Sequence, residues 1–128
     1  MTRTNLVPAA IGKPVAAYSH GVLSTTPERI LFTAGQVAIA PDGKIPQGIE
    51  AQLDRIYTNI QTILEDGGMG LADVVQVRIY LTDHSQVLPN RAALSKWLGS
   101  VNPAATTVIV KSLVSPDFLV EIEAVAAR

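Results

Sequence analysis

Hydrophobic and polar residues follow two different periods along this chain. The clearest alternation lies in residues 73–82, DVVQVRIYLT, and a period of two predicts a β-strand with one face on the core. The apolar side of this strand consists of Val75, Val77, Ile79 and Leu81. The other side consists of Val74, Gln76, Arg78, Tyr80 and Thr82.

The second period is that of an α-helix, and it is clearest in residues 48–66. Apolar residues recur there at steps of four and three, which places them in one stripe along a helix. The stripe consists of Ile49, Leu53, Ile56, Ile60 and Ile63. Gly67 and Gly68 follow, as glycines commonly do just past a helix C-terminus.

A second helix is expected at about residues 85–98. Asp83 or Ser85 can cap its N-terminus, and Pro89 is tolerable there because it falls near the helix start. The expected inward face consists of Leu88, Ala92, Leu94, Trp97 and Leu98.

The remaining apolar segments predict short strands. They are expected at residues 15–22, 30–39, about 44–46, 106–111 and 118–126. Turn residues separate them, namely PDGK at 41–44 and VSPD at 114–117. This order indicates a single α+β domain over residues 1–128, in which two helices cover one face of a mixed sheet.

The last expected strand, in LVEIEAV, indicates what lies on the other face of that sheet. Val120, Ile122 and Ala124 share one side. The second side mixes two carboxylates with two apolar residues, namely Leu119, Glu121, Glu123 and Val125. A fully solvated face is normally more polar, so we expect a subunit partner to cover part of it. At least one glutamate then lies near a half-buried cleft.

Composition excludes several classes of function. The 128 residues carry a net charge of −1, with 16% charged and 5% aromatic residues. Nucleic-acid binding requires clustered positive charge, and single strands usually stack on aromatic rings, so no nucleic-acid partner is expected. The chain has no cysteine, which excludes disulfides, thiolate metal sites and a cysteine nucleophile.

Two further exclusions concern metals and membranes. The only histidines, His20 and His84, are far apart in the sequence and lack metal-ligand spacing, so no metal site is expected. No apolar run approaches the roughly 18 residues of a membrane span. We therefore expect a cytoplasmic protein without a membrane partner.

Several stretches, taken in order, resemble the reactive intermediate deaminase family (RidA, also called YjgF). The matching stretches cover nearly the whole chain, and the VEIEA within the last of them is the most specific. They are YSHGV (18–22), TAGQ (33–36), PDGK (41–44), Gln52 and Asn59, ADVVQVRIYLTD (72–83), NPAATTVIV (102–110) and LVEIEAVA (119–126).

This resemblance implies a chorismate-mutase-like α+β fold and a homotrimer with a ligand cleft at each subunit interface. Well-studied members of the family hydrolyse reactive imines and enamines to ketoacids and ammonia, without a cofactor or metal. The family binds the substrate carboxylate through an arginine in a PAR motif, because a planar guanidinium matches a carboxylate in geometry and charge. Here Ala105 follows Pro103 and Ala104, so the chain resembles a branch without that arginine.

The resemblance also assigns other residues to the cleft. Glu121 matches the glutamate thought to position the attacking water, and Tyr18 and Gly35 match substrate-binding positions. Thr107 stands where the family has a cysteine. An asparagine of the second helix aligns with Arg91, while Asn90 lies one residue earlier, so the sequence leaves open which of the two lines the cleft.

Each of these residues also has a plainer interpretation. Glu121 and Arg91 can be solvated side chains of a sheet and a helix, and Tyr18 can simply pack at an interface. Two hypotheses for function therefore stand. The first is a cofactor-free imine or enamine hydrolase with altered substrate choice, whose substrate is either uncharged or held by another cation such as Arg91. The second is a non-catalytic trimer that binds a small molecule or assists a partner enzyme.

Overall fold

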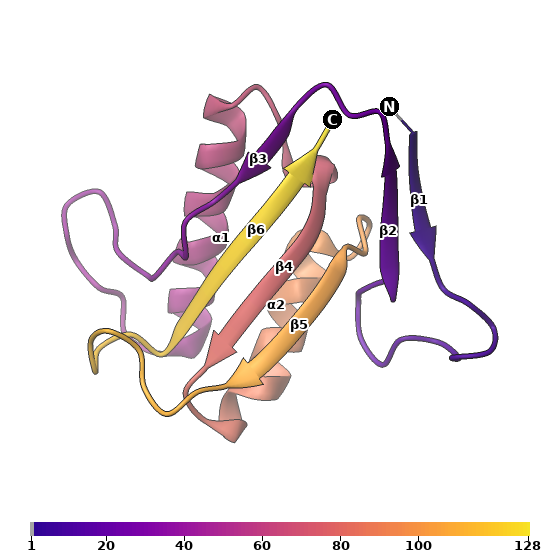
Figure 1. Ribbon diagram of the computed structural model, residues 1–128. Coiled ribbons are helices and arrows are strands. Elements are labelled where there is room, and N and C mark those ends of the chain that lie inside the picture. The colour runs from indigo at the N-terminus through magenta and orange to yellow at the C-terminus, as the bar shows by residue number, and fades with distance from the viewer. Residues whose placement is uncertain (1) are drawn as a thin grey trace.

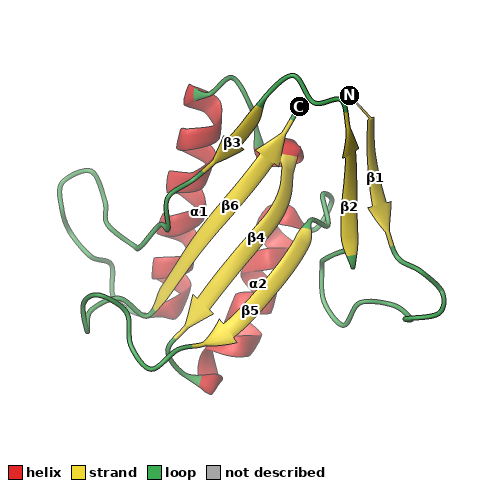
Figure 2. Ribbon diagram, in the orientation of Figure 1, coloured by secondary structure: helices red, strands yellow, loops and turns green. Residues whose placement is uncertain are grey.

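The computed structural model describes residues 2–128 as a four-stranded sheet with two helices on one face and a two-stranded ribbon at one side (Figures 1 and 2). In chain order the elements are β1 (Thr2–Leu6), β2 (Gly21–Thr25), β3 (Ile30–Phe32), α1 (Ile49–Asp66), β4 (Val74–Leu81), α2 (Val87–Leu98), β5 (Ala104–Ile109) and β6 (Val120–Ala127). Short 3₁₀ turns, η1 (Leu71–Asp73) and η2 (His84–Gln86), precede β4 and α2.

The sheet is mixed, as the sequence predicts. Its strand order is β3-β6-β4-β5, with β6 antiparallel to both of its neighbours and β5 parallel to β4. The parallel pair is connected by α2, since parallel strands need a crossover. Figure 1 shows both helices behind the sheet, so the opposite face is open in the single chain.

The core lies between the helices and the sheet. The stripe of α1 is confirmed, because Leu53, Ile56 and Ile60 are fully buried. They belong to one cluster with Val77 and Ile122 of the sheet. Burial of this apolar surface is the main favourable contribution to folding.

The alternation of β4 is confirmed from Val77 onward but wrong at its start. Val74 is fully buried and Val75 only half-buried, the reverse of the expectation. The pairing of β4 with β6 shifts register between Val74 and Gln76. Such a bulge adds one residue to the strand and turns Val74 toward the core.

The second helix begins later and faces the core differently than expected. Asp83 caps the preceding 3₁₀ turn, accepting a hydrogen bond from the Ser85 backbone N–H at 2.9 Å, and α2 proper starts at Val87. Leu88, expected to point inward, is 73% exposed. Ala92 is exposed too, and the buried face consists of Asn90, Ala93, Leu94 and Leu98.

Several strand boundaries also differ from the expectation. The strand expected at 30–39 ends at Phe32, and only Gln36 pairs again, with Ile122. The turn at 41–44 forms, with Lys44 C=O accepting from the Ala40 N–H, but no strand follows at 44–46. Because β3 ends at Phe32, no strand precedes this turn, and residues 44–46 have no neighbouring strand with which to pair.

The two-stranded ribbon was only partly foreseen. β2 overlaps the strand expected at 15–22 only at residues 21 and 22, and no strand was expected at β1. Arg3 fixes β1 to the domain, since its guanidinium donates to the carbonyls of Val74 at 2.6 Å and Val101 at 3.1 Å. Burial lowers the pKa of Arg3, with Asp73 acting in the opposite direction.

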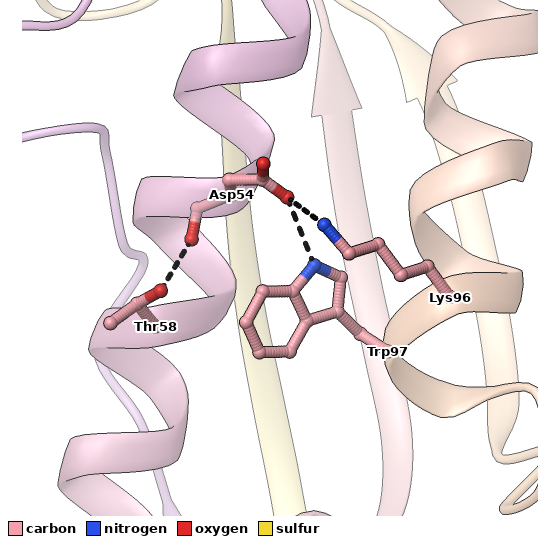
Figure 3. Close-up of polar contacts among 4 residues, drawn as sticks. All are labelled: Asp54, Thr58, Lys96 and Trp97. Carbon is pink, nitrogen blue, oxygen red and sulfur yellow. Dashed lines mark hydrogen bonds and ion pairs between the residues drawn. The ribbon is translucent and has the colours of Figure 1, made fainter.

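Side chains also join the two helices to each other. Lys96 and the indole N–H of Trp97, both on α2, reach Oδ1 of Asp54 on α1 at 3.1 and 3.2 Å (Figure 3). The Trp97 ring stacks on Tyr57, with ring centroids 5.7 Å apart. These contacts fix the position of α2, which forms one wall of the cavity described next.

Candidate functional site

A cavity of about 320 Å³ lies between β5, α2 and residues 15–18. Four of the sequence-predicted site residues line it, namely Tyr18, Arg91, Ala105 and Thr107. Its other walls are mostly apolar and include Val15, Val87, Leu94 and Ile109. A cavity of this size and lining suits a small organic ligand.

The register of β5 decides which of its residues face this cavity. Ala105 pairs with Val77 and Thr107 with Ile79, so both lie on the helix-covered side of the sheet. β5 is an edge strand, so its outer side has no neighbour along most of its length. Among the described residues 2–128, only Ser19 pairs there, with Ala104, and this places the adjacent Tyr18 at the cavity.

Both candidate residues of α2 line the cavity, but in different ways. Asn90 is 2% exposed, and its Oδ1 is buried without a hydrogen-bond partner. Arg91 is exposed, and none of the ion pairs among residues 2–128 involves it. The cavity is therefore lined by one buried amide side chain and by one exposed residue that carries a guanidinium.

Gly35 and Glu121 form a second group, away from this cavity. Glu121 pairs with Tyr80 across β6 and β4, which places its side chain on the open face of the sheet. Gly35 lies directly against the Glu121 carboxylate. No side-chain hydrogen bond or ion pair engages that carboxylate within residues 2–128.

The neighbouring glutamate is engaged instead. Glu123 accepts a hydrogen bond from the Tyr80 hydroxyl at 2.8 Å, and Arg78 lies 3.5 Å away. The hydrogen bond to Glu123 raises the pKa of Tyr80. Of the two carboxylates on this face of β6, Glu121 is thus the one that is free to meet a ligand.

The single chain does not assemble all predicted site residues in one place. Ala105 and Glu121 lie on opposite faces of the sheet, and β4 runs between their strands. The sequence left open whether Arg91 or Asn90 lines the cleft, and the cavity is lined by both. The burial of Asn90 follows from its spacing, because Asn90 lies three, four and eight residues before Ala93, Leu94 and Leu98, on the buried side of α2.

The histidines have other positions. His20 Nε2 lies 2.8 Å from the Gly12 carbonyl oxygen, and its ring contacts Tyr18 edge-on at 6.1 Å between centroids. Across residues 2–128, no group of three or more His, Asp or Glu side chains comes together to hold a metal. In the same range, no helix is long and apolar enough to cross a membrane.

The fold and this cavity define a class, namely small α+β domains that carry a ligand-sized cavity at the open edge of a mixed sheet. The sequence pattern of the family described as Endoribonuclease L-PSP matches residues 8–128, so the chain belongs to this family, which includes the RidA and YjgF proteins. The resemblance inferred from the motifs is thereby confirmed.

Relatives and solved structures agree with this assignment. A RutC family protein of Pyrococcus abyssi is 37% identical over 118 residues, covering 91% of this chain and 90% of the relative. A structure from the conserved Rid protein family of Yersinia pestis is 32% identical, with a TM-score of 0.85 and full coverage of both chains. The YjgF gene product of E. coli is 28% identical, with a TM-score of 0.72 over 95% of this chain and 93% of that one.

Proposed function

We propose that this protein hydrolyses a reactive imine or enamine at clefts formed between subunits of a homotrimer. The main observation in support of the proposal is that the candidate site residues lie on two different faces of the sheet. A ligand-sized cavity lies on one face of the sheet, and the unpaired Glu121 lies on the other. A second copy of the chain can bring its own Glu121 to the cavity, which one chain alone cannot do.

The open face of the sheet supports an assembly. Phe32 is 73% exposed, and it pairs with Val125 of β6 on the same face as Glu121 and Glu123. Val108 of β5 adds a further exposed apolar side chain. Apolar groups gathered on one face of a small domain are typical of an interface.

The assembly has its own test. Sedimentation equilibrium is expected to give the mass of three chains, and Phe32→Asp is expected to shift the protein to smaller species because it buries an unpaired charge. Leu88→Asp is the matched control, since Leu88 is equally exposed, at 73%, but lies on α2. A monomeric wild-type protein would contradict the proposed trimer.

The proposed chemistry needs only a positioned base and water. Glu121 of the partner subunit takes a proton from water as the oxygen adds to the imine carbon. The resulting carbinolamine then expels its nitrogen as ammonia, after that nitrogen gains a proton, and leaves a carbonyl compound. No electrons are transferred, so the reaction requires no redox cofactor.

A coupled assay tests this reaction. An amino-acid oxidase generates imines from a panel of amino acids, and semicarbazide competes for them, so hydrolysis by this protein lowers semicarbazone formation. Glu121→Gln is expected to abolish the effect with the oligomer intact. Glu123→Gln is the control, because Glu123 lies on the same face of β6 but is engaged by Tyr80 and Arg78. Full activity in Glu121→Gln would refute the mechanism.

The second candidate function is binding without catalysis. It is favoured by Ala105, because a buried carboxylate without its arginine partner loses roughly 2–5 kcal/mol of binding. Inactivity toward all imines, together with saturable binding of a small molecule at the cavity, would support it. RNA cleavage, which the family's description names, is not proposed, because the net charge of −1 offers no basic surface.

A further inference from the structure

We infer that Arg91 and Thr107 form a carboxylate-binding subsite at the α2 side of the cavity beside β5, and that the space next to Ala105 holds an alkyl group. The substrates are then imines of amino acids with an aliphatic side chain, and this substrate class rests on the proposed function. Three features support the inference, namely the charge of the cavity lining, two unpaired donors in it and the relative direction of α2 and β5.

Arg91 supplies the charge of the cavity lining. Among the described residues 2–128, those that line the cavity include no aspartate or glutamate, and no ion pair or side-chain hydrogen bond engages the Arg91 guanidinium. A cation without a carboxylate beside it attracts an anion, and a planar guanidinium can donate two parallel hydrogen bonds to one carboxylate. A positively charged ligand would be repelled here.

Two further hydrogen-bond donors belong to the same lining. Asn90 is 2% exposed, and its Oδ1 is enclosed, so Nδ2 is the amide atom that remains accessible; it also has no partner among residues 2–128. The Thr107 hydroxyl is likewise without a partner in the described chain. Buried polar groups are nearly always hydrogen-bonded, so an unpaired N–H at a cavity is suited to a ligand acceptor. A carboxylate is such an acceptor.

The direction of α2 decides which residues of the helix and the strand lie at the same level. α2 connects the parallel strands β4 and β5, and it therefore runs antiparallel to β5 (Figure 1). Val87, at the start of α2, thus lies toward Ile109 at the end of β5, and Leu94 lies toward Ala105. The two spans are similar, at about 10 Å along the helix and about 13 Å along the strand.

Arg91 and Thr107 lie between these two ends and so at one level of the cavity. A carboxylate bound there lies about 7 Å along β5 from Ala105, because two strand residues separate the positions. Ala105 and Leu94 are both apolar, and an alkyl group between them buries apolar surface favourably. The cavity therefore suits a small ligand with a carboxylate at one end and an aliphatic chain at the other.

The reaction on such a substrate balances as proposed above. Water adds through oxygen to the C=N carbon, and its proton passes to Glu121 of the partner subunit. The C–N bond breaks after the nitrogen gains a proton, and the nitrogen leaves as ammonia. A 2-oxo acid remains, whose carboxylate takes no part in the chemistry and serves to position the substrate.

Calorimetry with pentanoate and pentanamide tests the subsite without catalysis, because the two probes share an alkyl chain and differ in charge. We expect the wild-type protein to bind pentanoate about tenfold more tightly, which corresponds to about 1.4 kcal/mol. Arg91→Gln is expected to lose this preference, and Thr107→Val to weaken pentanoate binding. Lys111→Gln is the matched control, since Lys111 is exposed, carries the same charge and does not line the cavity.

Ala105→Leu tests the alkyl end of the cavity in the semicarbazide assay. The larger side chain fills the space beside Leu94, so hydrolysis of the norvaline imine is expected to fall about tenfold, whereas the alanine imine, with a single methyl group, should be affected much less. Ala105→Arg is expected to lower activity on the norvaline imine as well, because the carboxylate is not bound at this position. A gain of activity in Ala105→Arg would overturn the inference.

The two assays separate this inference from the proposed function. Equal binding of pentanoate and pentanamide, no binding of pentanoate, or unchanged pentanoate affinity in Arg91→Gln or Thr107→Val would overturn the inference. Hydrolysis of any imine would then leave the proposed function standing. Conversely, pentanoate binding that depends on Arg91, without hydrolysis of any imine, would overturn the proposed function and leave the carboxylate subsite standing.

Discussion

Gly35 and Glu121 lie so close together that no side chain fits between them. A Cβ atom added to Gly35 would lie 2.9 Å from Cδ of Glu121 and closer still to its Oε2. The Glu121 carboxylate therefore rests against the bare backbone of the loop after β3. Because no side-chain partner holds Glu121, this contact limits where its carboxylate can go.

Gly35→Ala is expected to displace the Glu121 carboxylate and to lower imine hydrolysis about tenfold or more, since a misplaced base loses much of its effect. The fold should persist, because the end of a flexible side chain can move aside. The coupled semicarbazide assay and circular dichroism check the two parts. Gly70→Ala is the control, as a Cβ there has no neighbour within 4 Å. Equal activity of the two variants would contradict the positioning role.

Tyr57→Phe is expected to stabilise the protein by about 1 kcal/mol, because it removes a buried hydroxyl that has no partner. Tyr57 is fully buried, and burial raises the pKa of its hydroxyl. Stacking on Trp97 is retained in the variant. Urea unfolding measures the difference, and Tyr80→Phe is the control, which loses a hydrogen bond to Glu123 and should show no such gain. A destabilised Tyr57→Phe would mean that a buried water satisfies the hydroxyl.

Gln52→Met is expected to destabilise the fold by roughly 2–4 kcal/mol. The buried Gln52 amide donates to the carbonyls of Pro46 and Asp117 at 3.1 and 2.8 Å, and accepts from the Leu119 N–H at 2.9 Å. Methionine matches the volume but leaves all three backbone groups unpaired. Chemical denaturation checks this, with Gln61→Met, on the same helix, expected to change stability by less than about 0.5 kcal/mol. Equal effects of both variants would show that the network contributes nothing.

The contact between Asp54 and Lys96 is expected to depend on pH. The hydrogen bond from Lys96, with a smaller contribution from Trp97, lowers the pKa of Asp54 below its usual value. A lowered folded-state pKa means that the stabilisation is complete above about pH 4, the pKa in the unfolded chain, and is lost as pH falls through the folded-state pKa. Both side chains are more than half exposed, so the effect should be below about 1 kcal/mol.

Thermal unfolding of wild type and Asp54→Asn between pH 2 and pH 7 measures this dependence. The wild type should be the more stable protein at neutral pH, and the difference should vanish at the acid end. A difference that stays constant down to pH 2 would show that packing, and not charge, is responsible.

The sequence by itself determined the main elements and the family. The apolar residues of α1 recur with a helical period, and those of β4 and β6 alternate, so each element has one face that must be buried. Few arrangements of a small domain bury all of these faces at once. The predictions from the sequence were wrong where a local irregularity of the backbone changes which side chains of a helix or strand face the core. Such irregularities include the bulge at Val74 and the 3₁₀ turn before α2, which leaves Leu88 exposed and Asn90 buried. Neither feature changes which residues of its segment are apolar, so the pattern of apolar residues does not indicate it.

Only the tertiary structure decided how the candidate site is divided. The motifs place Ala105 and Glu121 on two strands, but the face that each residue occupies depends on strand order and register, which arise from contacts between distant segments. The same contacts leave Oδ1 of Asn90 buried and without a hydrogen-bond partner among residues 2–128. A sequence pattern records which residues are apolar, whereas an unsatisfied polar atom exists only once its neighbours are in place.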